Sequence, residues 1–269
     1  MKPPPFEYVR PEGLDEAVHA LSQPDAKVLA GGQSLLPLLS MRLAAPRRLV
    51  DVNRLGELSY VRTDEAGVSI GALARHADVE QDDAAHSRLP LLRAALRLVA
   101  HPTIRNRGTT VGSIVHADAA AEMPTVLALL DGVVTLRSPQ GERTVAAADF
   151  FLGPLEADVR PGEIVTQVHL PARDAGTAID EIARRHGDYA LVGAAATVER
   201  EGRSRVGLFA VADTPVVVDV TDATSLDAAV DVVQAAVDPD TDIHASADYR
   251  RQLVDVLTRR VLTRAREAA

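Results

Sequence analysis

The chain has 269 residues, of which 46% are hydrophobic, and its formal net charge is −9 at pH 7. So acidic a chain lacks the basic surface that nucleic acids and anionic membranes require, and we expect neither as a partner. Because it contains no cysteine, it has no disulfide, thiolate metal site, catalytic thiol or cysteine-held iron–sulfur cluster. Without an apolar stretch long enough to span a bilayer, and without an apolar leader, we expect a cytoplasmic protein with no membrane insertion.

The first 55 residues have the pattern of a βαβ-like unit. Apolar residues spaced by three and four positions predict helices, and short apolar runs that end at glycine or proline predict strands. The predicted elements are a helix after Gly13, a strand at 27–30, a helix over 35–43 and a strand at 48–52.

The next hundred residues alternate between strand and helix patterns, with one polar interruption. We predict strands at 67–73, 132–138 and 163–170, helices at 89–100 and 125–130, and a turn at 138–141. The interruption, residues 101–124, is rich in polar groups and poor in regular signals, so we expect mainly loop there.

The pattern changes after a predicted linker at 172–178. Strands at 191–198 and 205–211 flank a hairpin signal, a third strand is expected at 215–220, and helices follow at 226–237 and from Ala247. The residues expected to form the buried stripe of the last helix are Tyr249, Leu253, Val256 and Leu257. We therefore divide the chain near residue 174.

A glycine pair stands between the predicted strand 27–30 and the helix that follows. Gly31 and Gly32 allow close backbone approach, and the amides at the start of a helix favour an anionic ligand such as a pyrophosphate. Ser34 has a hydroxyl that suits either a helix cap or a ligand oxygen. Taken alone, the stretch favours an ordinary turn, since it matches neither the dinucleotide fingerprint nor the Walker motif.

A second polar stretch, 105–118, combines two arginines with hydroxyls and glycines, which suits an anionic ligand as well as it suits a surface loop. His116 and Asp118 would share one face if the segment were a strand, which suggests a metal pair or an acid–base pair. Because two ligands are too few for a metal site, hydrogen-bonding structural roles are favoured. Asp188 follows two arginines and could pair with them or accept a hydrogen bond from a ligand hydroxyl; taken alone, it favours a salt-bridged turn.

Eight stretches together identify a family. They occur in the order FEYVRPEGLDEAVHAL, AKVLAGGQSLLPLLSMRLAAPRRLVDVNRL, IGALARHADVE, HPTIRNRGTTVGSIVHADAAAEMP, DFFLG, RPGEIVTQVHLP, ARRHGDYALVGAAA and DIHASADYRRQLVDVLTRRVL. In order and spacing the chain resembles the medium, FAD-binding subunit of molybdenum hydroxylases, the family of carbon monoxide dehydrogenase medium subunits and xanthine dehydrogenase flavin domains. The resemblance covers nearly the whole chain.

This resemblance implies an α+β fold with non-covalently bound FAD. Residues 1–174 would form a two-subdomain FAD-binding region of the vanillyl-alcohol-oxidase or p-cresol-methylhydroxylase type, with subdomains at about 1–55 and 56–174. Residues 175–269 would form a C-terminal α+β domain with a small antiparallel sheet and helices.

The resemblance also implies cofactor contacts. The positions that match the first pyrophosphate loop are Ala30, Gly31, Gly32, Gln33, Ser34 and Leu35, and those that match the second are Thr109, Thr110, Val111, Gly112 and Ser113. Glu122 matches an acidic cofactor contact, Val165 an apolar contact beside the flavin, and Asp188 with Tyr189 the place where the C-terminal domain meets it. No catalytic or metal-binding residue is implied in this chain.

In such complexes, a molybdenum-cofactor large subunit hydroxylates the substrate and a small subunit carries two [2Fe–2S] clusters. The resemblance implies that this chain relays electrons from those clusters through FAD to an acceptor. Two departures keep a second hypothesis open: Val111 replaces a glycine usual in the family, and residues 207–220 lack the usual glycine pair and arginine. That alternative is a repurposed homologue with weakened or lost FAD binding, acting as a stand-alone flavin-dependent enzyme or as a binding or scaffold protein.

Overall fold

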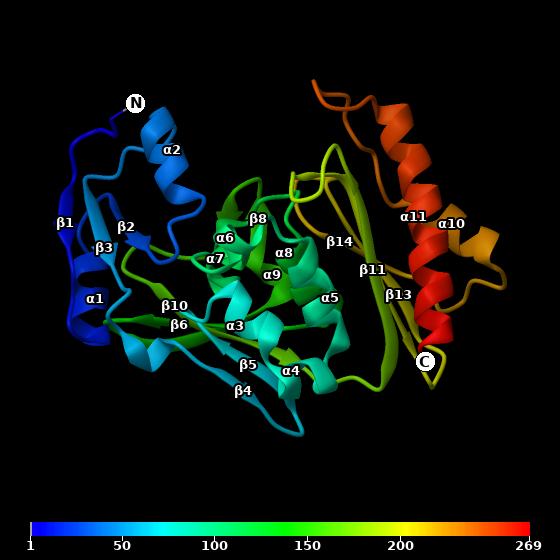
Figure 1. The fold of residues 1–269 in the computed structure, drawn as a ribbon, viewed down its shortest axis with the longest axis horizontal. Helices are drawn as coiled ribbons and strands as arrows, with labels where there is room; N and C mark the ends of the chain where they lie inside the picture. Colours follow the sequence, from blue (N-terminus) through cyan, green and yellow to red (C-terminus); the bar gives the residue numbers. More distant parts are fainter. Residues whose placement is uncertain (1) are drawn as a thin grey trace.

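The computed structural model describes residues 2–269. The chain opens with a three-stranded parallel sheet of strand order β1-β3-β2 (Figure 1). Its elements are β1 (Glu7–Val9), α1 (Leu14–Leu21), β2 (Ala26–Leu29), α2 (Leu35–Met41) and β3 (Arg48–Asp51). The predicted βαβ-like unit is confirmed. Only β1 escaped prediction, because three residues are too few to show a period.

A five-stranded antiparallel sheet of order β4-β5-β10-β6-β7 forms the middle of the molecule. Its strands are β4 (Val61–Thr63), β5 (Gly67–Gly71), β6 (Val133–Ser138), β7 (Gly141–Ala146) and β10 (Ile164–Pro171). The short elements beside it are the 3-10 turn η1 (Gly56–Leu58), the helix α9 (Ala147–Phe150), and the two-stranded pair β8 (Phe151–Gly153) and β9 (Glu156–Ala157).

Helices fill the long connection between β5 and β6. They are α3 (His76–Gln81), α4 (Asp83–Arg88), α5 (Pro90–Leu98), α6 (Pro102–Arg105), α7 (Thr110–His116) and α8 (Glu122–Leu129). The expectation of a mainly irregular segment at 101–124 was wrong. Both α6 and α7 are too short to show helical periodicity, and they start at local signals instead: a proline at the first position of α6, and a hydroxyl cap on α7, where Gly112 N donates to Thr109 Oγ1 at 3.1 Å.

The last sheet is antiparallel, with the order β11-β12-β13-β14, and one of its faces is covered by two helices (Figure 1). Its elements are β11 (Ala175–Ala183), β12 (Ala190–Glu199), β13 (Ser204–Phe209), β14 (Val216–Asp219), α10 (Leu226–Ala235) and α11 (Ala247–Glu267). The predicted linker was therefore too long, because β11 begins at Ala175. In α11, Tyr249 and Val256 are 43% and 40% exposed, so the predicted stripe was wrong at these two positions.

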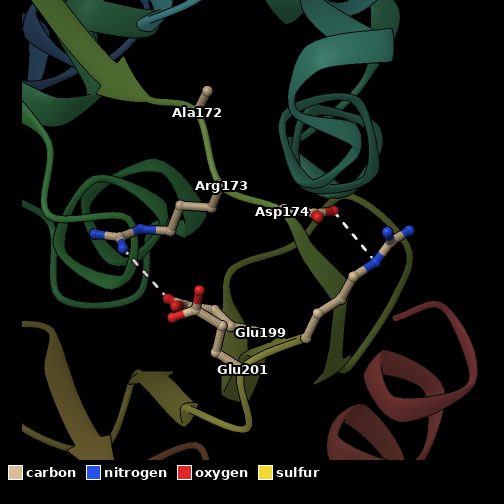
Figure 2. Close-up of a pocket in the computed structure, with 6 residues that line it drawn as sticks. Ala172, Arg173, Asp174, Glu199 and Glu201 are labelled. Carbon is tan, nitrogen blue, oxygen red and sulfur yellow. Dashed lines mark hydrogen bonds and ion pairs between the residues drawn. The ribbon is translucent and has the colours of Figure 1, made fainter.

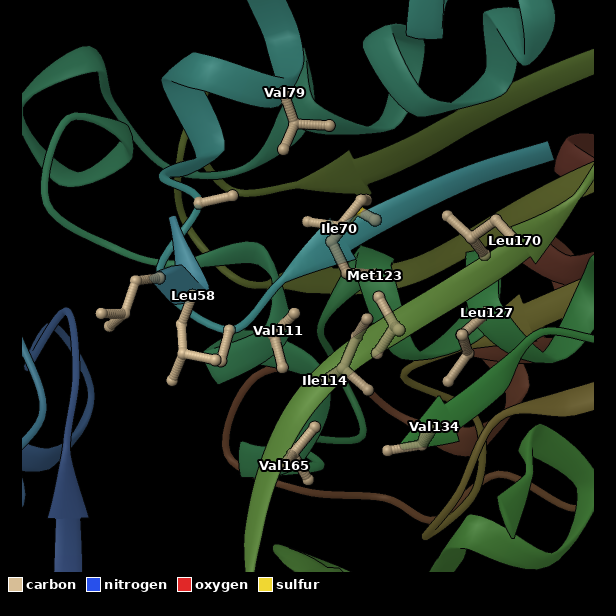
Figure 3. Close-up of a cluster of buried hydrophobic side chains, with 14 of the residues drawn as sticks. Leu58, Ile70, Val79, Val111, Ile114, Met123, Leu127, Val134, Val165 and Leu170 are labelled. Atoms are coloured by element: carbon tan, nitrogen blue, oxygen red, sulfur yellow. The ribbon is translucent and has the colours of Figure 1, made fainter. Parts of the chain in front are cut away.

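Buried apolar side chains form two clusters, one spanning the first two sheets and one between the last sheet and α10 and α11. Figure 3 shows Val111, Ile114, Met123 and Val165 within the first cluster. The helix α8 is buried over nearly its whole length and contacts α5, α7 and the last sheet, which fixes that sheet against the rest of the chain. No helix within residues 2–269 is long and apolar enough to cross a membrane.

Candidate functional site

The fold brings the two glycine-containing loops predicted from the sequence into direct contact. A Cβ atom at Gly31 would lie 2.5 Å from the carbonyl oxygen of Arg107 and 2.7 Å from the Cα of Gly108. Only glycine permits this approach, and the next residue, Gly32, adopts a φ of 74° that glycine reaches without strain. The first loop therefore lies against the backbone that leads into the second.

The first loop has backbone N–H groups that do not donate to any protein acceptor among residues 2–269. Within residues 2–269, the backbone N–H groups of residues 31–34 make no hydrogen bond to another protein group. Ser34 stands at the start of α2, yet its hydroxyl does not cap the helix, so a cap does not account for this serine. Gly31 is buried and residues 32–34 are half-buried. A row of such N–H groups next to a hydroxyl suits an anionic group with several oxygens.

A buried histidine, His76, forms hydrogen bonds with the second loop and with the residue just before it. His76 N donates to the Gly108 carbonyl at 3.0 Å, and the His76 Nδ1 and Thr110 Oγ1 atoms lie 3.2 Å apart. Burial, with a contribution from the Arg105 charge, lowers the pKa of His76 to about 4. The imidazole is therefore neutral at pH 7 and supports the loop through hydrogen bonds alone. Thr109 is buried with its side chain committed to the α7 cap.

Val111 occupies an ordinary helical position. It is the second residue of α7, has no positive φ, and is only 2% exposed. Its side chain lies in the apolar cluster of Figure 3. A β-branched residue is strained where the backbone needs a positive φ, and because Val111 has none, replacing the family's glycine by valine carries no such cost. The following residues, Gly112 and Ser113, lie half-buried on the first turn of the same helix.

Glu122 begins α8 and is 9% exposed. Burial, together with the Asp118 carboxylate, raises its pKa to about 7. Glu181 on β11 approaches from the last sheet; burial and the charges of Glu122 and Asp180 raise its pKa to about 8. One Glu181 carboxyl oxygen, Oε2, is buried without a hydrogen-bond partner among residues 2–269. Both carboxyls therefore favour the protonated form more strongly than a solvent-exposed glutamate does.

Asp188 and Tyr189 lie exposed in the turn between β11 and β12, and Tyr189 is 67% exposed. In residues 2–269 no ion pair joins Asp188 to an arginine, so the salt-bridged turn was wrong; the Asp188 amide instead donates to the Arg185 carbonyl at 3.1 Å. Partial desolvation and the carboxylates of Asp118 and Glu122 raise the pKa of Tyr189. The turn therefore reaches the surroundings of Glu122.

Other residues in the polar stretch are already committed to structure. Arg105 pairs with Glu80 at 2.8 Å, so it is not a free cation for a ligand. His116 ends α7 and Ala117 has a φ of 52°, which means that His116 and Asp118 do not share the face of a strand. Val165 lies on β10, 5% exposed, in the same apolar cluster as Val111.

Sequence reasoning missed two polar residues that contact the loops, Asn53 and Arg75. Asn53 Nδ2 donates to the Ala30 carbonyl at 2.9 Å, and Arg75 Nη1 donates to the Arg107 carbonyl at 2.6 Å. Both lie within stretches that carry the family resemblance, but their sequence positions give no sign that they meet.

A separate hollow between the β10–β11 connection and the β12–β13 turn is lined by charged residues (Figure 2). Its charges pair with each other: Arg173 with Glu199 at 3.3 Å and Arg200 with Asp174 at 3.5 Å. Because both of its arginines are already paired with carboxylates, we do not assign it a ligand. Across residues 2–269, no group of three or more His, Asp or Glu side chains is placed to hold a metal ion.

Comparison with known proteins identifies the class to which this arrangement belongs. Residues 4–173 match the model of the FAD binding domain in molybdopterin dehydrogenase, and residues 177–265 match the CO dehydrogenase flavoprotein C-terminal domain. The chain therefore belongs to the family of FAD-binding medium subunits of molybdenum hydroxylases, which confirms the family predicted from the sequence.

Individual relatives match over nearly their full lengths. The chain is 39% identical to the 6-hydroxypseudooxynicotine dehydrogenase complex subunit alpha of Paenarthrobacter nicotinovorans, covering 98% of this chain and 96% of that one. It is 34% identical to the carbon monoxide dehydrogenase medium chain of Hydrogenophaga pseudoflava, over 98% of each. Its mixed α/β fold matches a chain of quinoline 2-oxidoreductase from Pseudomonas putida 86 with a TM-score of 0.93 and 37% identity, covering 99% of both chains.

Proposed function

We propose that this chain is the FAD-binding electron-transfer subunit of a molybdenum-containing hydroxylase. It would take electrons from the iron–sulfur clusters of a small partner subunit and pass them through FAD to an acceptor, while a large subunit holds the molybdenum cofactor and selects the substrate. Family membership supports this role, and so does the lack of cysteine, since the clusters need another chain.

One observation carries the cofactor assignment: among residues 2–269, the N–H groups of residues 31–34 have no protein acceptor, and Gly31 lies against the backbone that leads into the second loop. These donors and the Ser34 hydroxyl fit the oxygens of a pyrophosphate. The first pyrophosphate loop would be Ala30 to Leu35, and the second Thr109 to Ser113.

The remaining contacts follow from burial and charge. Burial raises the pKa of Glu122 to about 7, so its carboxyl would donate a hydrogen bond to the cofactor far more readily than a solvent-exposed glutamate. Val165 would limit water beside the flavin, and Asp188 with Tyr189 would close the site from the last sheet. Bound FAD would supply the electron-carrying chemistry, and this chain would bind it, orient it and shield it from water.

We further propose the domain division expected from the sequence. Residues 1–174 would be an FAD-binding domain of the vanillyl-alcohol-oxidase or p-cresol-methylhydroxylase type with subdomains at about 1–55 and 56–174, and residues 175–269 would be the C-terminal domain. The confinement of each of the three main sheets to one of these ranges supports this division.

Titration of the purified chain with FAD tests the proposal. We expect one FAD per chain, seen as flavin absorbance that co-elutes with protein, and weak binding by Gly31→Ala, whose added Cβ would meet the backbone of Arg107. Gly56→Ala is the matched control, because nothing lies within 4 Å of a Cβ there. Wild type that retains no flavin after incubation with FAD would rule out the cofactor assignment.

A second experiment tests the role in a complex. Affinity purification of the tagged chain from its own source should recover a subunit that carries molybdenum cofactor and one that carries iron–sulfur clusters. Recovery of flavin-loaded chain alone, at low ionic strength and without these subunits, would favour the stand-alone flavoprotein instead.

A further inference from the structure

The guanidinium of Arg75 connects the two loops, although Arg75 belongs to neither. It precedes α3, and its Nη1 donates to the carbonyl oxygen of Arg107 at 2.6 Å. Its Nη2 donates to Oδ1 of Asn53 at 2.8 Å. Asn53 in turn donates through Nδ2 to the carbonyl of Ala30 at 2.9 Å. An unbroken series of hydrogen bonds thus runs from the backbone of the first loop to the backbone that leads into the second.

Both ends of this series are fixed by further contacts. Asp51 is buried; its Oδ1 accepts from Asn53 N at 2.9 Å and from Asn53 Nδ2 at 2.7 Å, while its Oδ2 accepts from the hydroxyl of Tyr8. At the other end, the backbone of Arg75 forms an isolated antiparallel bridge with Thr109. Arg75 is therefore held in place relative to the second loop, and Asn53 relative to the first sheet.

The series fixes the direction of a free donor. In a trans peptide the carbonyl oxygen and the next N–H point to opposite sides. Because Asn53 holds the Ala30 carbonyl, the Gly31 N–H points away from Asn53. In the described part of the chain, residues 2–269, that N–H has no protein acceptor.

We propose that Arg75 is a positioning residue for the anionic cofactor: it sets the relative placement of the two loops, through Asn53 on one side and the Arg107 carbonyl on the other. The inference rests on the proposed function for its ligand, a pyrophosphate-containing cofactor. The planar guanidinium is essential because two of its nitrogens serve two acceptors at once, whereas the ammonium of a lysine concentrates its charge and donors on one atom.

Arg75→Lys separates this role from simple charge attraction. It keeps the positive charge and loses the simultaneous contacts. Loss of charge-assisted hydrogen bonds of this kind corresponds to about a 10- to 100-fold rise in the Kd for FAD. We expect that rise in Arg75→Lys, measured by titrating the full-length apo chain with FAD, and little change in Arg97→Lys, a control at an exposed arginine of α5. Wild-type affinity in Arg75→Lys would overturn the proposal.

Double substitution tests whether the two side chains act in series. Arg75→Lys and Asn53→Ala interrupt the same connection, so the double variant should bind FAD about as weakly as the weaker single variant. Independent effects, in which the fold-changes of the single variants multiply, would also overturn the proposal.

Hydrogen exchange of the apo chain gives a readout that needs no FAD. In Arg75→Lys the hydrogen-bonded amides at the two loops should exchange faster than in wild type, namely those of Leu36 and Val52 beside the first loop and those of Thr110 and Gly112 in the second. The last sheet, β11–β14, should keep its protection. Unchanged exchange in both loops would refute the positioning role. Because this measurement uses apo protein, a wild type that binds no FAD would refute the proposed function while this measurement still decides whether Arg75 couples the loops.

Discussion

Val111→Gly introduces the glycine that is usual in the family at this position, and the structure predicts that the substitution lowers the stability of the folded chain. Val111 is 2% exposed inside the apolar cluster of the first two sheets. Burying a valine side chain contributes about 1.5–3 kcal/mol, and glycine within a helix costs about 0.5–1 kcal/mol relative to alanine. We therefore expect the free energy of unfolding to fall by about 2–4 kcal/mol in Val111→Gly.

Urea unfolding of wild type, Val111→Ala and Val111→Gly measures this loss. The alanine variant removes the packing alone, so its difference from the glycine variant isolates the backbone contribution of about 0.5–1 kcal/mol. FAD titration of the same three proteins should give no gain in affinity for glycine, since Val111 has no positive φ to relieve. A glycine variant as stable as wild type that binds FAD more tightly would refute the reasoning from burial.

Three further predictions concern charges. Burial raises the pKa of Glu122 from 4.5 to about 7, so the folded state keeps this proton to a higher pH than the unfolded state does. The resulting contribution to the free energy of unfolding is full below pH 4.5 and is lost as the pH rises through 7. In Glu122→Gln, urea unfolding at a series of pH values should no longer show this loss. Burial lowers the pKa of His76 to about 4, so here the unfolded chain binds the proton first. Wild type should therefore lose about 3 kcal/mol relative to His76→Gln as the pH falls from about 6.5 to about 4. Asp131→Asn removes a counter-charge of Arg205, which is 5% exposed, and should cost about 2 kcal/mol in thermal unfolding, whereas Asp25→Asn in an exposed pair should cost less than about 1 kcal/mol.

Each of these three predictions can be contradicted by a specific result. Parallel pH–stability curves for wild type and Glu122→Gln would show that burial does not perturb that carboxyl, and the same comparison applies to His76. Asp131 and Asp25 both have positive φ, which asparagine tolerates, so backbone strain does not separate the two variants. Equal losses in both would show that the buried guanidinium of Arg205 does not depend on its partner.

Much of the fold follows from local patterns. The hairpin of β12 and β13 was predicted from two apolar runs around a turn signal, and α10 from its apolar spacing. Such elements are long enough for a period to repeat, and the order of the family motifs supplied their arrangement. The strand β11 was not predicted, because Ala175 and Gly176 are residue types common in linkers. Pairing with β12 determines its conformation.

The candidate site also has features that the sequence predicted and features that only the tertiary structure shows. The sequence by itself identified the family and both loops, because glycines and hydroxyls stand at fixed spacings along the chain. Only the tertiary structure decided that Gly31 lies against the backbone of Arg107, that Arg75 and Asn53 connect the loops, and that burial raises the pKa of Glu122. These properties depend on distance and desolvation between residues far apart in the chain, and neither quantity is encoded in local spacing.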